Sequence, residues 1–198
     1  MEKTNPLQIR FLGPYSVGKT SIMKQFIFSD YKKMFYDERM IGVQPYTKSI
    51  TLNDETITLF IIDSTIFGLN NKIPVNKVVK NDFFTAQGIF LVFDLSNNES
   101  LPVLQMLTKE IWKILLSDSK VKTFNPHIMI IGNKRDLQDS ETRLFTKKEI
   151  SDSINQIKHV TNLKNEIEYI EVSAKTGDNI FSMFEKMAMG IISNEKKR

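Results

Sequence analysis

The sequence predicts an α/β fold in which helices flank a six-stranded, mostly parallel β-sheet. Short apolar segments with strand character alternate with longer segments whose apolar residues recur at helical spacing, which is typical of parallel strands joined by helical crossovers. Gly88 to Asp94 contains five consecutive apolar residues, as expected of a strand buried on both faces. The 198 residues suit one domain, which we expect to span 1–198 with its core from about 7 to 192.

The first half of the chain is predicted to contain one strand, one helix and a hairpin. Leu7 to Leu12 is the strand. A helix follows, with apolar positions at Ile22, Met23, Phe26 and Ile27. Tyr46 to Leu52 and Thr56 to Ile62 are predicted strands, and Asn53-Asp54 between them favours a tight antiparallel turn. Ser64 to about Lys80 is a long irregular segment, and such loops are often functional.

In the second half, strands and helices are predicted to alternate. Ser100 is expected to cap a helix, and Ile128 to Ile131 to form a buried strand. The apolar face of that helix comprises Leu104, Leu107, Ile111 and Leu115. Thr146 and Glu149 have the spacing of a capping box, which begins a helix to about Val160.

The chain is predicted to end with a strand and a helix. The strand runs from Ile167 to Val172, and Asp178 is expected to cap the helix. The core face of the helix comprises Ile180, Phe181, Phe184, Met187, Ala188 and Ile191. Trp112, off the main stripe of its helix, is expected to be partly buried. His127 and His159 lack a second ligand at metal spacing and are expected at the surface or a strand edge.

Composition excludes several classes of function. The net charge of +4 is mild, and no basic patch is interleaved with aromatic residues, so nucleic-acid binding is not expected. Without cysteine, the chain has no disulfide, no thiolate metal site and no cysteine lipid anchor. No apolar run is long enough to span a membrane, and no signal-peptide pattern opens the sequence. We therefore expect a cytoplasmic protein.

The loop after the first strand fits the phosphate-binding pattern G-x-x-x-x-G-K-[ST] from Gly13 to Thr20. Its strand and helix flanks supply the context that this motif requires, although a glycine turn can fit the pattern by chance. The glycines allow the backbone to approach a phosphate closely, and backbone N–H groups at the helix N-terminus face the anion. Lys19 is expected to reach the β- and γ-phosphates, and Thr20 to bind Mg²⁺.

Three further motifs follow predicted strands and therefore lie at the same edge of the sheet as the phosphate loop. They are Asp63, Asn133-Lys134-Arg135-Asp136 and Ser173-Ala174-Lys175. An ionised Asp136 accepts hydrogen bonds only, so it can take both adjacent donors of guanine, N1–H and the 2-amino group. Adenine lacks these donors and would leave bonds unmade, at about 1–3 kcal/mol. The chemistry therefore favours guanine.

In this order the motifs resemble those of the small GTPases of the Ras superfamily, and the Rab branch is nearest. Besides the phosphate loop, N-K-x-D and S-A-K, the resemblance includes Ile41-Gly42-Val43 and the aromatic pair Phe83-Phe84. It covers about Leu7 to Ile192 and implies a G domain with the P-loop NTPase fold, which binds GTP or GDP with Mg²⁺. Thr20 and Asp63 are then the metal ligands.

The resemblance also assigns roles to individual residues. Asn133 braces the pocket, Lys134 and Lys175 lay their stems over the base, the Ala174 N–H meets guanine O6, and Tyr31 packs against the base edge. The complete set of expected nucleotide-binding residues is Gly13, Tyr15, Ser16, Val17, Gly18, Lys19, Thr20, Ser21, Tyr31, Asn133, Lys134, Asp136, Leu137, Ser173, Ala174 and Lys175.

The chain departs from the family pattern where the γ-phosphate is sensed. Met40 replaces the threonine that binds Mg²⁺, and the alternative alignment places Glu38 there. Ile66 replaces the glycine of D-x-x-G, and Phe67 replaces the glutamine that orients water. Tyr15 is bulky where small residues predominate, and should crowd an arginine finger. No catalytic residue is therefore predicted. Random sequence drift is the alternative explanation, but it would not spare the β-phosphate and base contacts.

Two hypotheses follow. The first is a Rab-like GTPase in vesicle trafficking that hydrolyses GTP slowly. The second is a pseudo-GTPase binding module whose nucleotide is structural and which does not switch. A P-loop kinase or ATPase is disfavoured by Asp136 and Ser173-Ala174-Lys175, which read guanine. We expect a monomer without a lipid anchor in this chain, recruited to membranes through protein effectors or regulators that the sequence does not identify.

Overall fold

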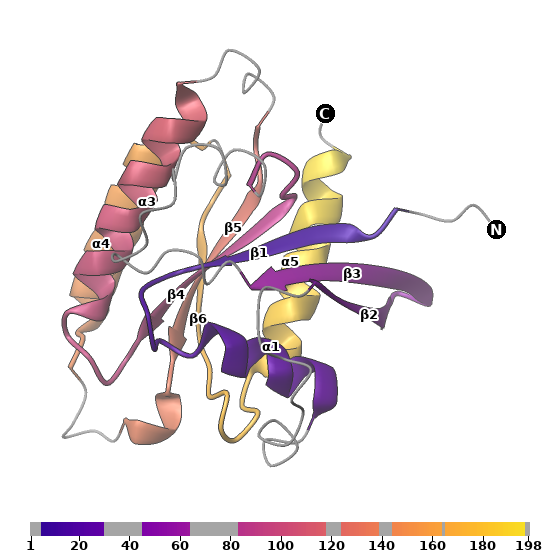
Figure 1. Cartoon of the computed structure of the whole chain (residues 1–198), viewed down its shortest axis with the longest axis horizontal. Coiled ribbons are helices and arrows are strands. Elements are labelled where there is room, and N and C mark those ends of the chain that lie inside the picture. The colour runs from indigo at the N-terminus through magenta and orange to yellow at the C-terminus, as the bar shows by residue number, and fades with distance from the viewer. Residues whose placement is uncertain are drawn as a thin grey trace.

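The computed structural model describes residues 5–29, 45–63, 83–117, 124–138, 144–163 and 165–196. Its elements alternate between strand and helix after the first hairpin (Figure 1). In chain order they are β1 (Leu7–Leu12), α1 (Lys19–Phe28), β2 (Pro45–Leu52), β3 (Glu55–Asp63), β4 (Gly88–Asp94), α3 (Ser100–Leu116), β5 (His127–Asn133), the 3₁₀ turn η4 (Arg135–Leu137), α4 (Lys147–Thr161), β6 (Glu168–Glu171) and α5 (Ile180–Glu195).

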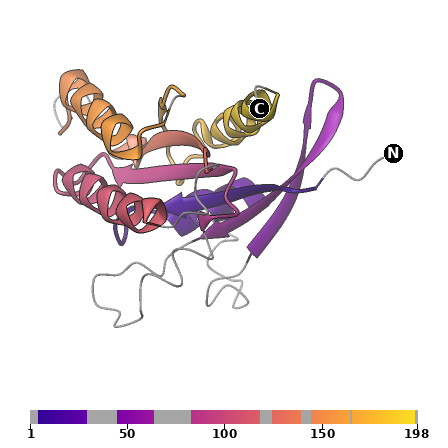
Figure 2. The same cartoon turned by 90° about the horizontal axis from the view of Figure 1, so that it is seen from above.

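The described strands form one six-stranded sheet in the order β2-β3-β1-β4-β5-β6. β2 and β3 pair antiparallel, and every other neighbouring pair is parallel. The predicted α/β fold with a mostly parallel sheet is therefore confirmed, and the strand boundaries differ from the prediction by no more than two residues. Helices cover both faces, with α3 and α5 on opposite sides of the sheet (Figure 2).

Alternation along the strands divides the core between the two faces. In β4, Phe90 and Val92 pack toward α1 and α5, whereas Ile89, Leu91 and Phe93 pack toward α3 and α4. Each face of the strand is thus covered by apolar side chains, which explains its continuous apolar run. On the first face, the Phe26 ring of α1 stacks on the Phe184 ring of α5 with centroids 3.8 Å apart.

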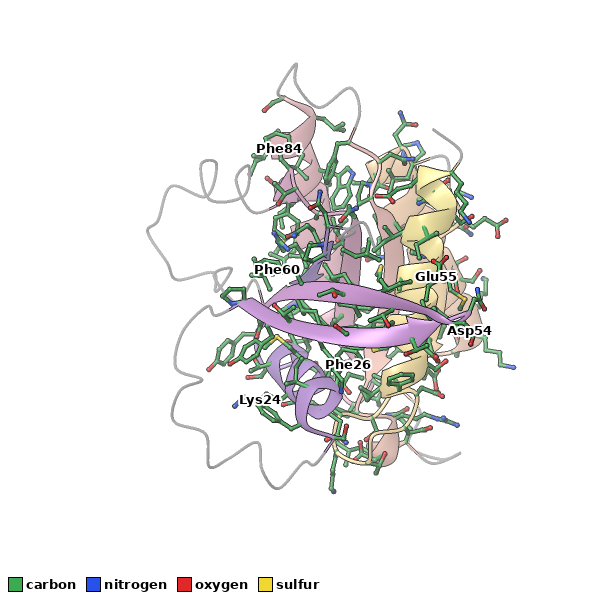
Figure 3. The ribbon with its side chains drawn as sticks, turned by 90° about the vertical axis from the view of Figure 1, so that its right-hand side faces the viewer. Lys24, Phe26, Asp54, Glu55, Phe60 and Phe84 are labelled. Carbon is green, nitrogen blue, oxygen red and sulfur yellow. The ribbon has the colours of Figure 1, made fainter. Side chains whose placement is uncertain are left out.

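The β2–β3 hairpin is tied to α1. Asn53 and Asp54 adopt left-handed backbone angles (φ of 49° and 64°), which a two-residue hairpin turn favours, and this confirms the predicted turn. Figure 3 shows Asp54 and Glu55 at the hairpin tip. Lys48 of β2 donates to the carbonyl oxygen of Phe26, and its ammonium lies 4.6 Å from the centre of that ring. Burial lowers the Lys48 pKa.

The second core face confirms one predicted cap and corrects another. Thr146 and Glu149 form both bonds of the capping box at the start of α4. Ser100, however, is the first residue of α3 and not its N-cap, a position that Glu99 occupies. The Ser100 hydroxyl instead bonds to the backbone of Asp94 and Asn97. The tight turn after β4 brings these backbone groups within its reach.

Four other predictions about single residues are wrong. Phe181, predicted on the core face of α5, has 49% of its surface exposed. Asn179, and not Asp178, is the N-cap of α5, and its side chain makes no capping bond. The Asp178 carboxylate instead pairs with Arg135 at 2.5 Å. Trp112 is fully buried, with 1% of its surface exposed, and its ring lies 6.2 Å from that of Phe124. His127 is also buried, at 6% exposure.

Among the described residues, no helix is long and apolar enough to cross a membrane.

Candidate functional site

The loop from Gly13 to Thr20 connects β1 directly to α1, which begins at Lys19. Gly18 has a φ of 93°, and a Cβ there would lie 2.3 Å from Nδ2 of Asn133. A Cβ on Gly13 would lie 2.1 Å from the carbonyl oxygen of Val92. Both positions therefore require glycine, and the loop is left with the bare backbone that anion binding at a helix N-terminus uses.

Lys19 lies folded against the loop that carries it. Its ammonium donates to the carbonyl oxygens of Gly13 (2.8 Å) and Pro14 (2.7 Å). Burial lowers the Lys19 pKa, and the nearby Asp63 carboxylate opposes that shift. The cation is thus buried at the mouth of the loop, where an anionic ligand would offset its desolvation.

Thr20 and Asp63 come together at the same place. The Thr20 hydroxyl donates to Oδ2 of Asp63. Burial raises the Asp63 pKa, while this hydrogen bond and the Lys19 charge act in the opposite direction. Oδ1 of Asp63 is buried and has no hydrogen-bond partner in the described part of the chain. A hydroxyl and a carboxylate with a spare oxygen are hard-cation donors, so these residues fit Mg²⁺.

The donor set also fits the way in which Mg²⁺ binds in nucleotide sites. Within the described residues, no group of three or more His, Cys, Asp or Glu side chains could hold a metal ion. Mg²⁺ commonly needs fewer, since it is bound by one or two carboxylates together with phosphate oxygens and water. The predicted pair of Thr20 and Asp63 therefore fits a Mg²⁺ site that phosphate oxygens and water would complete.

Asn133 connects the phosphate loop to the S-A-K loop. Its side-chain Nδ2 donates to the carbonyl oxygen of Val17 (2.8 Å), and its Oδ1 accepts from the backbone N–H of Ala174 (3.1 Å). Only 1% of the residue is exposed. Because both ends of one buried amide are used, the two loops are held at a set separation.

A cavity of about 310 Å³ lies between these loops, at the lower end of the range for ligand sites. The predicted residues that line it are Gly18, Ser21, Asn133, Lys134, Asp136, Leu137, Ala174 and Lys175. Within it, Oδ1 of Asp136 accepts from the Ser173 hydroxyl (2.6 Å), and the Lys175 ammonium lies 3.8 Å from Oδ2. The carboxylate is thereby oriented while retaining free acceptor positions.

Some predicted residues lie elsewhere. Tyr15 projects from the phosphate loop with 83% of its surface exposed, and Ser173 is buried behind Asp136 and does not line the cavity. Tyr31, Met40 and Phe67 lie outside the described residues, as do Glu38 and Ile66. Sequence reasoning missed Asp94, whose carboxylate pairs with Lys134 at 2.6 Å. The position of Asp94 at a strand end could have marked it as a site residue, but nothing in the sequence indicated its pairing with Lys134.

Comparison with known proteins identifies the class. A model described as "Ras family" matches residues 8–193, so the chain belongs to the Ras family. The Ypt/Rab-type GTPase ypt7 of Schizosaccharomyces pombe is 28% identical, over 98% of this chain and 85% of that protein. GTP-binding protein YPT53 of Saccharomyces cerevisiae is 28% identical over 93% of this chain and 76% of that protein. Ras-related protein RABG3c of Arabidopsis thaliana is 28% identical over 96% of this chain and 84% of that protein. These relatives confirm the Rab-like resemblance.

Proposed function

We propose that this chain is a single-domain, monomeric, Rab-like small GTPase that binds GDP and GTP together with Mg²⁺. The observation that carries the proposal is the position of Asp136. Its carboxylate lines a cavity that the Asn133 amide joins to the phosphate loop. One ligand can therefore engage a base-reading carboxylate and the phosphate loop at the same time.

The base end of the cavity favours guanine. Ser173 holds one oxygen of Asp136, which leaves lone pairs that can accept from guanine N1–H and the 2-amino group. The resemblance makes the Ala174 N–H the donor to guanine O6. In this structure that N–H donates to Asn133 Oδ1, so it would exchange this acceptor for O6 when guanine binds. Lys134 and Lys175 are expected to flank the base with their aliphatic stems.

The phosphate end supplies charge and backbone donors. Lys19 would exchange its two carbonyl partners for the β- and γ-phosphates, and Thr20 and Asp63 would hold the metal. Mg²⁺ supplies the positive charge that neutralises the phosphate oxygens. The remaining expected contacts, from Tyr15, Ser16, Val17 and Ser21, belong to the loop and the first turn of α1.

We propose that GTP hydrolysis is slow. Met40, Ile66 and Phe67 replace the family's threonine, glycine and glutamine, and Phe67 cannot orient the attacking water. The exposed Tyr15 ring stands where an arginine finger would approach. The same replacements favour a second candidate function, a pseudo-GTPase that binds a structural nucleotide without switching.

The resemblance to Rab proteins leads us to propose a role in vesicle trafficking. None of the 198 residues is cysteine, so none of them can carry a prenyl group. We propose that this cytoplasmic protein reaches membranes through protein partners. The proposal does not involve nucleic acid.

Three measurements test the proposed function. Nucleotide released from the purified protein should be GDP or GTP, and finding adenine nucleotide or none would contradict guanine binding. Single-turnover hydrolysis of bound GTP then separates the two candidates, with slow conversion to GDP expected for a GTPase and none for a pseudo-GTPase. Hydrogen exchange of residues 31–42 and 64–80 should differ little between GDP and a non-hydrolysable GTP analogue. Strong protection only with the analogue would show that the protein still switches.

A further inference from the structure

A buried carboxylate at the end of β4 has no part in the proposed chemistry. Asp94 is 5% exposed, and each of its oxygens has its own partners. Oδ1 accepts from the backbone N–H (2.8 Å) and the hydroxyl (2.6 Å) of Ser96. Oδ2 lies 2.6 Å from the ammonium of Lys134. The position of the lysine ammonium is therefore determined by an oriented carboxylate.

The backbone around Asp94 is itself held in place. The Ser100 hydroxyl accepts from the Asp94 N–H (3.0 Å) and lies 2.8 Å from the Asp94 carbonyl oxygen. Asp94 is also in register with Asn133 across the β4–β5 pair. Asp94 is thus fixed by the sheet, next to Asn133, the residue that connects the two nucleotide loops.

Lys134 needs such support. Its backbone adopts a left-handed conformation with a φ of 67°, which is uncommon for a residue with a side chain. Its side chain, 34% exposed, lines the cavity together with Asp136. A lysine stem has four rotatable carbons and occupies many rotamers when its ammonium is free.

We propose that Asp94 is a positioning residue of the guanine-nucleotide site. Its carboxylate holds the Lys134 ammonium so that the lysine stem forms one wall of the base cavity. The same ion pair keeps that ammonium away from Asp136, whose oxygens must accept from the base. Asp94 does not line the cavity and acts only through Lys134. This inference rests on the proposed function.

The test is a double-mutant cycle on the affinity for fluorescently labelled GDP in the presence of Mg²⁺. Asp94→Asn, which keeps the shape of the side chain, should raise the Kd about tenfold. Lys134→Met should raise it by a similar factor, and the double variant should bind no more weakly than Lys134→Met alone. A milder variant, Ser96→Ala, removes one bond to the Asp94 carboxylate and should raise the Kd about threefold.

Asp178→Asn is the matched control. Asp178 pairs with Arg135, the next residue of the same loop, at 2.5 Å, and neither lines the cavity. The Kd of Asp178→Asn for labelled GDP should stay within about twofold of the wild-type value. Inorganic pyrophosphate, measured by competition, should bind Asp94→Asn as it binds the wild type, whereas general loss of structure would weaken both ligands.

The outcomes separate this inference from the function on which it rests. If the wild type binds no GDP, the proposed function fails. If the wild type binds GDP, the positioning role is overturned by an unchanged Kd for Asp94→Asn. It is also overturned if Asp94→Asn weakens GDP binding as much in the Lys134→Met background as in the wild type. A parallel loss of affinity for pyrophosphate in Asp94→Asn would overturn it as well. Should Asp94→Asn not fold, an unchanged Kd for Ser96→Ala overturns it.

Discussion

The side-chain amide of Asn133 donates to the carbonyl oxygen of Val17 across 116 residues of sequence, at 2.8 Å. Because the same amide accepts from Ala174, it couples the phosphate loop to the base loop. Asn133→Ala should leave a buried carbonyl and a buried N–H without partners, at about 1–3 kcal/mol. We predict weaker GDP binding and a lower Tm without nucleotide. Gln156→Ala, which removes an exposed bond from Gln105 of α3 to Gln156 of α4, is the control, and equal effects of the two variants would contradict the coupling.

Asp136 gives a prediction about base selectivity. Asp136→Asn replaces an acceptor with an amide that also donates. Affinity for GDP should fall, and affinity for xanthosine diphosphate should rise, because the 2-oxo group of xanthine accepts a hydrogen bond. Competition against labelled nucleotide measures both. An unchanged GDP affinity would show that Asp136 does not read the base, and exposed Asp152→Asn on α4 should change neither affinity.

Asp63 gives a prediction about the metal. Removing Mg²⁺ with EDTA should accelerate GDP release from the wild type by about tenfold or more, because the phosphates lose their bridging cation. In Asp63→Ala, release should be fast already and respond little to EDTA. Release rates of labelled GDP measure this. A variant that keeps the full EDTA response would exclude Asp63 as a metal ligand.

His127 gives a prediction about pH. Burial lowers its pKa below the ordinary value of 6.5, and Glu168 opposes the shift. The folded state therefore favours neutral imidazole, so the unfolded chain binds more protons as the pH falls below about 6.5. The free energy of unfolding should decrease from pH 7 to pH 5. The variant His127→Gln, whose side chain does not titrate, should lose less free energy of unfolding over that range. Equal losses for the variant and the wild type, measured by urea denaturation, would rule out His127 as the source of the pH dependence.

The fold and the phosphate loop could be predicted because their signals are local. Gly18 and Lys19 belong to one contiguous motif, and the alternation in β4 reflects its two apolar surroundings. Trp112 could not be placed by helical periodicity, because Phe124, which packs against it, lies outside the helix. His127 is buried because α5 approaches it at Gly190, where a Cβ would lie 2.3 Å from its ring.

The site was predictable in outline, because its motifs lie at the ends of parallel strands. The ion pair of Asp94 and Lys134 was not, because it depends on the register between β4 and β5 and on a left-handed backbone at Lys134. Neither feature leaves a pattern in the sequence. The roles of Tyr31, Met40, Ile66 and Phe67 remain predictions, since these residues lie outside the described part of the chain.

Titration of the nucleotide-free protein with GDP and with ADP, in the presence of Mg²⁺, tests the central claim most directly. Asp136 and the Ala174 N–H can satisfy guanine but leave adenine with unmade bonds, so we predict that GDP binds at least about a hundredfold more tightly than ADP. Equal affinities for the two nucleotides, or tighter binding of ADP, would contradict the account.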